Sequence, residues 1–192
     1  MKLLIFGASG PLGRAITQAA LAAGHQVTAF VRTPGRLGSQ PGLREVSGDV
    51  LDAGPVVAAV PGHDLHPGTG YIIAAMKATG VSRLIWISSH GVGDARGHSG
   101  FLFERIFVPW RLRAEFTDKE RQEALVTATD LDWTIIRPAR LTNGPATRRL
   151  QAQPRLPVTI RDSISRADVA QFVLGELKTG THLLTAPTIA AT

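Results

Sequence analysis

Short apolar runs alternate with stretches of mixed polarity along most of the 192-residue chain. The apolar runs have the length of buried strands and lie at 2–6, 26–31, 43–47, 83–87, 132–136 and 181–185. The intervening stretches predict helices at 14–23, 55–60, 70–79, 110–129 and 165–177. This alternation predicts an α/β fold: a doubly wound, mostly parallel sheet with helices on both faces and a small C-terminal segment on the substrate side.

Local signals mark the ends of several predicted helices. Gly24 and Gly80 follow the first two long helices as stop signals, and Pro109 stands near the start of the helix at 110–129. Ser165 and Asp168 have the spacing of a capping box, which satisfies free N–H groups at a helix start. The hydrophobic pattern and the end signals therefore predict the same elements.

A doubly wound sheet needs a fourth strand before the helix at 70–79. Residues 61–68 fill this space with two prolines and no β-branched residue, a poor composition for a strand. Each buried backbone group left unpaired at the edge of the first strand would cost about 1–3 kcal/mol. We therefore expect that edge to be covered by the strand at 83–87, by a segment of the natural protein that this sequence lacks, or by a partner chain.

Composition narrows the class of protein. With 44% hydrophobic and 19% charged residues, the chain is typical of one globular domain, which we place at 1–192. The absence of cysteine excludes disulfides, thiolate metal sites and cysteine nucleophiles. No apolar stretch is long enough to span a bilayer, so we expect a cytoplasmic protein without membrane contacts.

The net charge of +6 does not by itself indicate a nucleic-acid partner. The arginines are dispersed, and neither Arg111 with Arg113 nor Arg148 with Arg149 is interleaved with stacking aromatics. The histidines are scattered as well, so we expect neither nucleic-acid binding nor a metal site. The apolar segment 101–110 is core, a lid over a flat substrate, or a dimer contact, and we expect a monomer or a homodimer.

The turn after the first strand carries the clearest chemical signal. It reads Gly-Ala-Ser-Gly-Pro-Leu-Gly at 7–13 and leads into a helix. Gly7 allows the tight turn, Gly10 lets phosphates approach the backbone, and Gly13 lets the helix pack against the strand. The helix dipole adds positive potential for a pyrophosphate. The predicted dinucleotide-binding residues in this turn are Gly7, Ser9, Gly10, Pro11, Leu12 and Gly13.

The end of the second strand indicates which dinucleotide is preferred. An acidic residue there would bind the ribose 2′-hydroxyl of NAD and repel a 2′-phosphate. This chain has Arg32 at that position and Arg36 shortly after it. Because a guanidinium binds phosphate through charge and paired hydrogen bonds, we predict that NADP(H) is preferred over NAD(H).

Six motifs spread over nearly the whole chain belong to one recognisable pattern: residues 7–13, 31–32, 48–50, 74–81, 131–138 and 164–170. Among them are Leu-Asp-Trp-Thr-Ile-Ile-Arg-Pro at 131–138 and Ile-Ser-Arg-Ala-Asp-Val-Ala at 164–170. Together they resemble the atypical short-chain dehydrogenase/reductase family, in its NmrA-like and biliverdin-IXβ/flavin-reductase-like branch. The resemblance implies an NAD(P)-binding Rossmann protein. In such relatives the fourth strand follows a Gly-x-Asp like 62–64, which favours a missing segment after Asp64.

The resemblance also suggests residues for the remaining parts of the site. Asp49 and Val50 resemble the pair that contacts adenine, although Asp49 has a capping role open to it. Ser88 and Ser89, at the end of a central strand, resemble serines that position substrate or nicotinamide. Pro138 lies in the 137–140 segment, which should border the nicotinamide.

One catalytic position departs from the pattern of standard short-chain dehydrogenases. Lys119 matches the lysine of their Tyr-x-x-x-Lys pair, but Glu115 stands where the tyrosine would be. Lys119 also has an ordinary role available, an i,i+4 ion pair with Glu123. The predicted catalytic residues are Ser88, Ser89 and Lys119. Reduction of a flavin or quinone does not require the tyrosine, because solvent can supply the proton.

The sequence therefore predicts an NADP(H)-dependent oxidoreductase that transfers hydride to a flavin, a quinone or a similar conjugated acceptor. Its substrate would be a small aromatic or quinone-like molecule. An NmrA-like regulator that senses the dinucleotide without turnover is the alternative from another class. A weaker alternative is an epimerase or dehydratase of the extended family, which the missing tyrosine and the short C-terminal region oppose.

Overall fold

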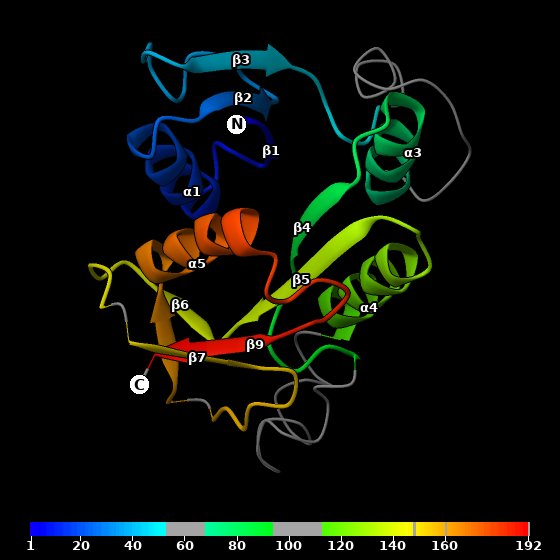
Figure 1. Ribbon diagram of the computed structural model, residues 1–192, viewed down its shortest axis with the longest axis vertical. Helices are drawn as coiled ribbons and strands as arrows, with labels where there is room; N and C mark the ends of the chain where they lie inside the picture. Colours follow the sequence, from blue (N-terminus) through cyan, green and yellow to red (C-terminus); the bar gives the residue numbers. More distant parts are fainter. Residues whose placement is uncertain (53–67, 94–112, 148, 160, 192) are drawn as a thin grey trace. The chain divides into compact units, whose positions relative to one another are not determined.

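The computed structural model describes residues 1–52, 68–93, 113–147, 149–159 and 161–191, and it divides into two compact units (Figure 1). The first unit comprises Met1–Val81 with Ala170–Lys178, and the second comprises Ser82–Val169 with Thr179–Thr192. The predicted helix at 55–60, most of the Pro/Gly segment 61–68, and the apolar segment 101–110 lie outside the described residues. No helix in the described part of the chain has the length and apolar character needed to cross a bilayer.

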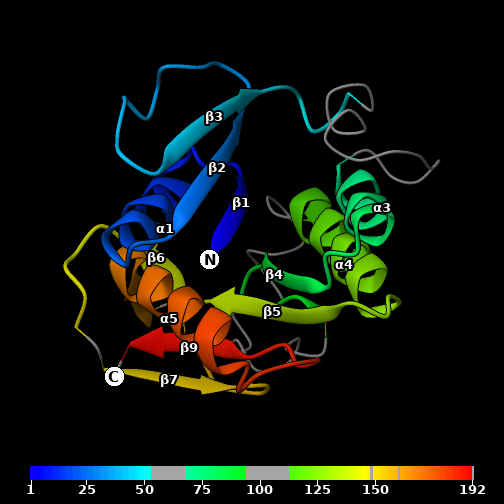
Figure 2. The ribbon, with the colours of Figure 1, turned by 45° about the horizontal axis from the view of Figure 1, so that its top comes forward.

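The first unit contains a parallel three-stranded sheet. Its strands are β1 (Lys2–Phe6), β2 (Gln26–Val31) and β3 (Leu43–Ser47), in that order. β1 pairs with β2 and β2 with β3, all in parallel register. Figures 1 and 2 both show the three strands, coloured blue to cyan, side by side with α1 (Pro11–Ala22) next to them. All three strand ranges agree with the sequence prediction.

The packing of this unit explains the local sequence. Ala29 and Val31 of β2 form a buried cluster with Ala8 and Leu37, and Ile5 and Leu43 of the flanking strands pack against that cluster. α3 (Thr69–Thr79) ends at Gly80, whose φ of 70° provides the left-handed cap that L-residues adopt at a cost.

The second unit contains a four-stranded sheet in the order β4-β5-β9-β7. These strands are β4 (Arg83–Ile87), β5 (Asp132–Pro138), β9 (Thr188–Ala191) and β7 (Leu150–Gln153). β4, β5 and β9 run parallel, whereas β7 is antiparallel to β9 at the edge. α4 (Arg113–Thr127) connects β4 to β5, which makes this part a parallel crossover.

A two-stranded parallel ladder of β6 (Arg140–Thr142) and β8 (Ser163–Ser165) precedes α5 (Arg166–Thr179). The helix cap predicted at Ser165 is present: the Ser165 hydroxyl accepts the N–H of Asp168 at 2.9 Å and donates to the Asp168 carboxylate at 2.8 Å. The same carboxylate accepts the N–H of Thr147 at 2.8 Å. This helix start therefore also fixes the segment that follows β6.

The predicted final strand at 181–185 is wrong. Residues after Gly180 form a turn in which Leu184 has a φ of 54°, and only Thr185 makes a bridge, to Thr134. Leu183 and Leu184 are exposed, so this apolar run is not a buried strand. The strand that completes the sheet is β9, which begins after Pro187. β6, β7 and β8 were not predicted, because strands of three or four residues give a weak pattern.

The strand missing from the predicted sheet would pair with the edge of β1 that faces away from β2. Among the described residues, β1 pairs with β2 alone, and β4 belongs to a different hydrogen-bonded sheet. Since β1 and β4 belong to different units, the way in which this edge of β1 is covered stays a prediction.

Candidate functional site

The glycine turn has the conformation that its sequence predicts. Gly7 has a φ of +69°, and the N–H of Gly10 donates to the Gly7 carbonyl at 3.0 Å. A Cβ placed on Gly13 would lie 2.2 Å from that carbonyl oxygen and 2.8 Å from the Ala8 Cα, far inside van der Waals contact. Gly13 is thus required for the close packing of α1 on the turn, as predicted.

The start of α1 is suited to an anion. Gly10 is the N-cap and provides no side-chain hydrogen bond, Pro11 occupies the first turn, and that turn has no acidic residue. Free N–H groups and the positive end of the helix dipole therefore face the turn without a competing carboxylate. The Arg14 Nε donates to the Ser9 carbonyl at 2.9 Å, which fixes the turn from the helix side. These features fit a bound pyrophosphate.

A concave, open pocket of about 270 Å³ lies beside this turn. It is lined by Ser9 of the turn and by Arg32, Thr33 and Arg36 of the loop after β2. The structure thus brings together three residues that were predicted separately as cofactor ligands, and it adds Thr33. Thr33 was missed, although its place between the two arginines is the signal that could have identified it.

The two residues predicted at the adenine lie just after β3. The Asp49 carboxylate accepts the N–H of Leu51 at 3.0 Å, and the Asp49 carbonyl accepts the N–H of Asp52 at 3.1 Å. The capping role that the sequence left open is therefore present. Val50 packs 3.7 Å from where a Cβ of Gly68 would stand. Contact of Asp49 and Val50 with adenine stays a prediction.

Ser88 and Ser89 follow β4 directly, at the carboxyl end of a parallel strand. The Ser88 N–H donates to the Ile136 carbonyl at 2.8 Å, which extends the pairing with β5. Ser88 is only 4% exposed, and its hydroxyl has no hydrogen-bond partner among the described residues. Because buried hydroxyls are nearly always bonded, this one is available to a ligand or an ordered water.

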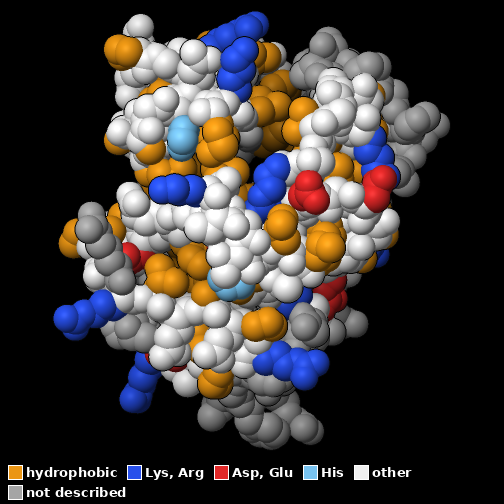
Figure 3. Space-filling model, viewed as in Figure 1, with side chains coloured by type: hydrophobic (Ala, Val, Ile, Leu, Met, Phe, Trp, Pro, Cys, Tyr) orange, Lys and Arg blue, Asp and Glu red, His pale blue; other side chains and the backbone are white. Residues whose placement is uncertain are grey.

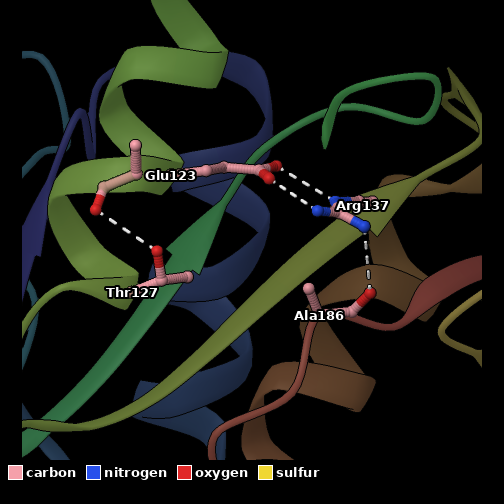
Figure 4. A network of polar contacts seen from close by, with 5 residues as sticks. Glu123, Thr127, Arg137 and Ala186 are labelled. Carbon is pink, nitrogen blue, oxygen red and sulfur yellow. Dashed lines mark hydrogen bonds and ion pairs between the residues drawn. The ribbon is translucent and has the colours of Figure 1, made fainter. Parts of the chain in front are cut away.

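Arg137 and Glu123 form a buried ion pair between β5 and α4 (Figure 4). The Arg137 Nε donates to Glu123 Oε1 at 3.1 Å and Nη2 to Oε2 at 2.6 Å, while Nη1 reaches the Ala186 carbonyl at 3.5 Å. The two side chains are 4% and 6% exposed. The Arg137 guanidinium is therefore bound to Glu123, and the expectation that the 137–140 segment borders the nicotinamide stays a prediction.

This ion pair also decides the alternative role of Lys119. Both oxygens of Glu123 are bonded to Arg137, and Lys119 makes no ion pair among the described residues. Pairing with Glu123 is thus wrong as an account of this lysine. Lys119 lies one turn before Glu123 on the same helix face and is half-buried, whereas Glu115, at the tyrosine position, is exposed.

The loop after β4 passes close to the ion pair of Arg137 and Glu123. Gly93, in the loop after Ser88 and Ser89, has a φ of +63°, and a Cβ there would stand 2.6 Å from Arg137 Nη2 and 2.9 Å from Glu123 Oε2. Pro138 is buried, and its carbonyl accepts the N–H of His90 at 3.2 Å. The loop after β4 is therefore held against β5 and α4 on both sides.

The acidity of Asp162, in the turn before β8, is changed by its surroundings. Hydrogen bonds from the N–H and hydroxyl of Thr159, both 2.7 Å, hold the pKa of Asp162 below its usual range, and the charge of His90 acts in the same direction. This places the turn before β8 within electrostatic reach of the loop after β4.

We searched the described part of the chain for clusters of side chains that could bind a metal ion. No group of three His, Asp or Glu side chains there could hold a metal ion. On the face shown in Figure 3, Lys and Arg side chains are spread from the top to the bottom, with a small group at the top. The glycine turn with its arginine pocket belongs to the first unit, whereas Ser88, Ser89, Lys119 and Pro138 belong to the second.

Comparison with known proteins identifies the family. The sequence profile of a family described as NAD(P)H-binding matches residues 7–179, from the glycine turn to the last residue of α5. The chain is 31% identical over 119 residues to the 2-alkyl-3-oxoalkanoate reductase of Stenotrophomonas maltophilia, covering 51% of this chain. It spans only 36% of the length of that reductase.

A chloroplast protein of uncharacterized function from Arabidopsis thaliana is 26% identical over 206 positions, covering 92% of this chain and 71% of that protein. An alignment longer than the 192-residue chain includes positions that have no counterpart here.

Solved structures agree on the fold. ChuY, an anaerobillin reductase from Escherichia coli O157:H7, superposes with a TM-score of 0.76 and 25% identity, covering 98% of this chain and 96% of ChuY. The oxidoreductase ylbE from Lactococcus lactis superposes with a TM-score of 0.83 at 20% identity, covering 100% of this chain and 91% of ylbE. The predicted α/β fold with a parallel sheet and flanking helices is confirmed.

Proposed function

The chain belongs to the NAD(P)H-binding family, among the atypical short-chain dehydrogenase/reductase Rossmann proteins, and we propose that it is an NADP(H)-dependent oxidoreductase. Its substrate would be a small aromatic or quinone-like molecule, that is, a flavin, a quinone or a similar conjugated acceptor. The observation that carries the proposal is the pocket of Ser9, Arg32, Thr33 and Arg36 beside the glycine turn. The names of two similar proteins, an oxoalkanoate reductase and an anaerobillin reductase, support a reductase.

The pocket supports the choice of NADP(H). Two arginines, a serine and a threonine line it, and guanidinium and hydroxyl groups are donors that bind a phosphate monoester. In the described part of the chain, its lining contains no carboxylate that would repel a phosphate. The residues of 7–13 would hold the pyrophosphate, and Arg32 and Arg36 would hold the 2′-phosphate of the adenosine ribose.

Bound NADPH would supply a hydride, and hence two electrons, to the acceptor. The protein's own part is to position the acceptor and manage one proton. The unpartnered Ser88 hydroxyl can donate a hydrogen bond to an acceptor oxygen or to the nicotinamide amide, with Ser89 next to it. The half-buried Lys119 ammonium, which has no carboxylate partner among the described residues, can stabilise a developing negative charge.

The test is NADPH oxidation measured against a panel of flavins, quinones and carbonyl compounds. We expect turnover with at least one conjugated acceptor, and a loss of turnover in Lys119→Ala without loss of NADPH binding. Lys178→Ala, which changes an exposed lysine of α5, is the matched control.

A dinucleotide sensor is the second candidate, because Glu115 occupies the position of the proton-donating tyrosine. Calorimetric binding of NADPH together with no oxidation across the panel would favour the sensor over the reductase.

A further inference from the structure

A carboxylate from β3 holds the loop that bears the two arginines. Oε2 of Glu45 accepts the N–H of Gly35 at 2.5 Å, and Oε1 accepts the N–H of Leu37 at 3.1 Å. These two amides flank Arg36 in the chain, so the backbone on both sides of Arg36 is bound to one side chain. A hydrogen bond to an ionised carboxylate is stronger than one between neutral groups.

The same loop is anchored a second time, by packing. Leu37 is buried in the cluster with Ala8, the residue that precedes Ser9 in the glycine turn. The Leu37 carbonyl also accepts the side-chain amide of Gln40 at 2.9 Å. The loop and the turn, which supply the two walls of the pocket, therefore share one core.

The loop needs this restraint because its own backbone has much conformational freedom. Gly35 and Gly38 both have positive φ, 84° and 71°, and glycine has the largest conformational freedom to lose. Arg32 and Arg36 are exposed, so neither is held by burial. Without a clamp, both side chains and the backbone between them would have to be ordered when the ligand binds, which weakens binding.

We infer that Glu45 is a positioning residue that sets the preference for the phosphorylated dinucleotide, by holding Arg36 and the loop from Thr33 to Leu37 in the shape of the pocket. This inference rests on the proposed function, since it names what organises the proposed 2′-phosphate site. Glu45 does not touch the ligand. Its two oxygens are occupied by loop amides, so the carboxylate acts through the loop.

The direction in which NADPH affinity changes when Glu45 loses its charge distinguishes the positioning role from a purely electrostatic one. Removing a negative charge near a phosphate site should strengthen NADPH binding if charge alone mattered. In Glu45→Gln the amide keeps one acceptor oxygen, but its NH₂ group faces the second loop amide, so the clamp is broken. We therefore expect NADPH affinity to fall about tenfold, the equivalent of roughly one charge-assisted hydrogen bond. NADH, which lacks the 2′-phosphate, should lose less than about twofold.

The experiment measures Kd for NADPH and NADH by calorimetry on the full chain as wild type, Glu45→Gln, Glu45→Asp and Asp132→Asn. The last variant removes an exposed carboxylate of the second unit and should leave both constants unchanged. Glu45→Asp keeps the negative charge on a shorter side chain. Its Kd for NADPH should therefore lie between the values of wild type and Glu45→Gln. In wild type, amide exchange should be slower at Gly35 and Leu37 than at Arg36, which tests the clamp without any variant.

Stronger or unchanged NADPH binding in Glu45→Gln, or equal losses for both dinucleotides, would overturn the inference, as would fast exchange at Gly35 and Leu37. The failure of the proposed function looks different: wild type would show no preference for NADPH, and Arg32 and Arg36 variants would have no effect. If those arginines matter and Glu45 does not, only the role of Glu45 is refuted.

Discussion

At the scale of single residues, the proposed 2′-phosphate site predicts that dinucleotide selectivity depends on the charge of Arg32, which lines the pocket beside the glycine turn. In Arg32→Glu, a carboxylate would face the ribose and repel a 2′-phosphate. Loss of the charge-assisted contact should cost on the order of 2 kcal/mol, roughly thirtyfold in NADPH affinity, and reverse or abolish the preference. Calorimetry with NADPH and NADH measures it, with Arg44→Glu, an exposed arginine of β3, as the control. Equal wild-type affinities for the two dinucleotides would contradict the prediction.

Two glycines of the turn should separate binding from folding. Gly10→Val would place a branched side chain against the pyrophosphate, and its Cβ would stand 3.3 Å from the Gly7 carbonyl, a contact that a small shift relieves. We expect it to fold and to lose NADPH binding. Gly13→Ala would clash at 2.2 Å with the same carbonyl and should lower the thermal unfolding midpoint instead. Gly144→Ala, where the space is open, is the control. If Gly10→Val folds and still binds NADPH normally, the pyrophosphate does not lie against this turn.

The buried hydroxyl of Ser88 gives a third test at this scale. If Ser88 served only the fold, Ser88→Ala would remove an unpartnered polar atom and leave stability unchanged or slightly raised. We expect that stability result together with reduced turnover, because the hydroxyl would no longer position the acceptor or the nicotinamide. Thermal unfolding and steady-state kinetics, measured on the same preparation, distinguish a structural role of Ser88 from a functional one. Full activity in Ser88→Ala would remove this residue from the candidate site.

At the scale of elements, the bidentate pair of Arg137 and Glu123 joins α4 to β5 and lies against the loop after β4. Removing one partner leaves an uncompensated buried charge, so Glu123→Ala should lower the free energy of unfolding by about 3–5 kcal/mol. Replacing both, as Glu123→Leu with Arg137→Met, should cost clearly less than the two single changes together. Urea denaturation measures all of these variants. Strict additivity would show that the pair is not coupled.

At the scale of the whole molecule, the open question is the strand that would lie beside β1. Among the described residues only β2 pairs with β1. The plant relative aligns over more positions than this chain has residues. The longer alignment agrees with the prediction of a segment missing from this sequence, and the place of that segment after Asp64 stays a prediction. The intact mass of the protein purified from its source should therefore exceed 20.4 kDa, and a mass equal to that value would refute the missing segment.

The elements with strong local patterns could be predicted from the amino-acid order alone. β1, β2, β3 and β4 have the predicted bounds, because each is a short run bounded by polar or glycine residues. The glycine turn was equally clear, since the tight turn and the close helix contact depend on the missing Cβ at particular positions. The place of Arg32 beside the glycine turn could also be predicted, because Arg32 follows the end of β2 directly, and its contact with a 2′-phosphate stays a prediction.

Contacts between distant parts of the chain could not be predicted in this way. That Glu123 pairs with Arg137 rather than with Lys119 depends on how α4 lies against β5, and the i,i+4 spacing alone favoured the wrong partner. The clamp by Glu45 depends on a loop that folds back over β3. The edge strands β6 to β8 are too short to carry a period, so their pairing partners, rather than their own residues, make them strands.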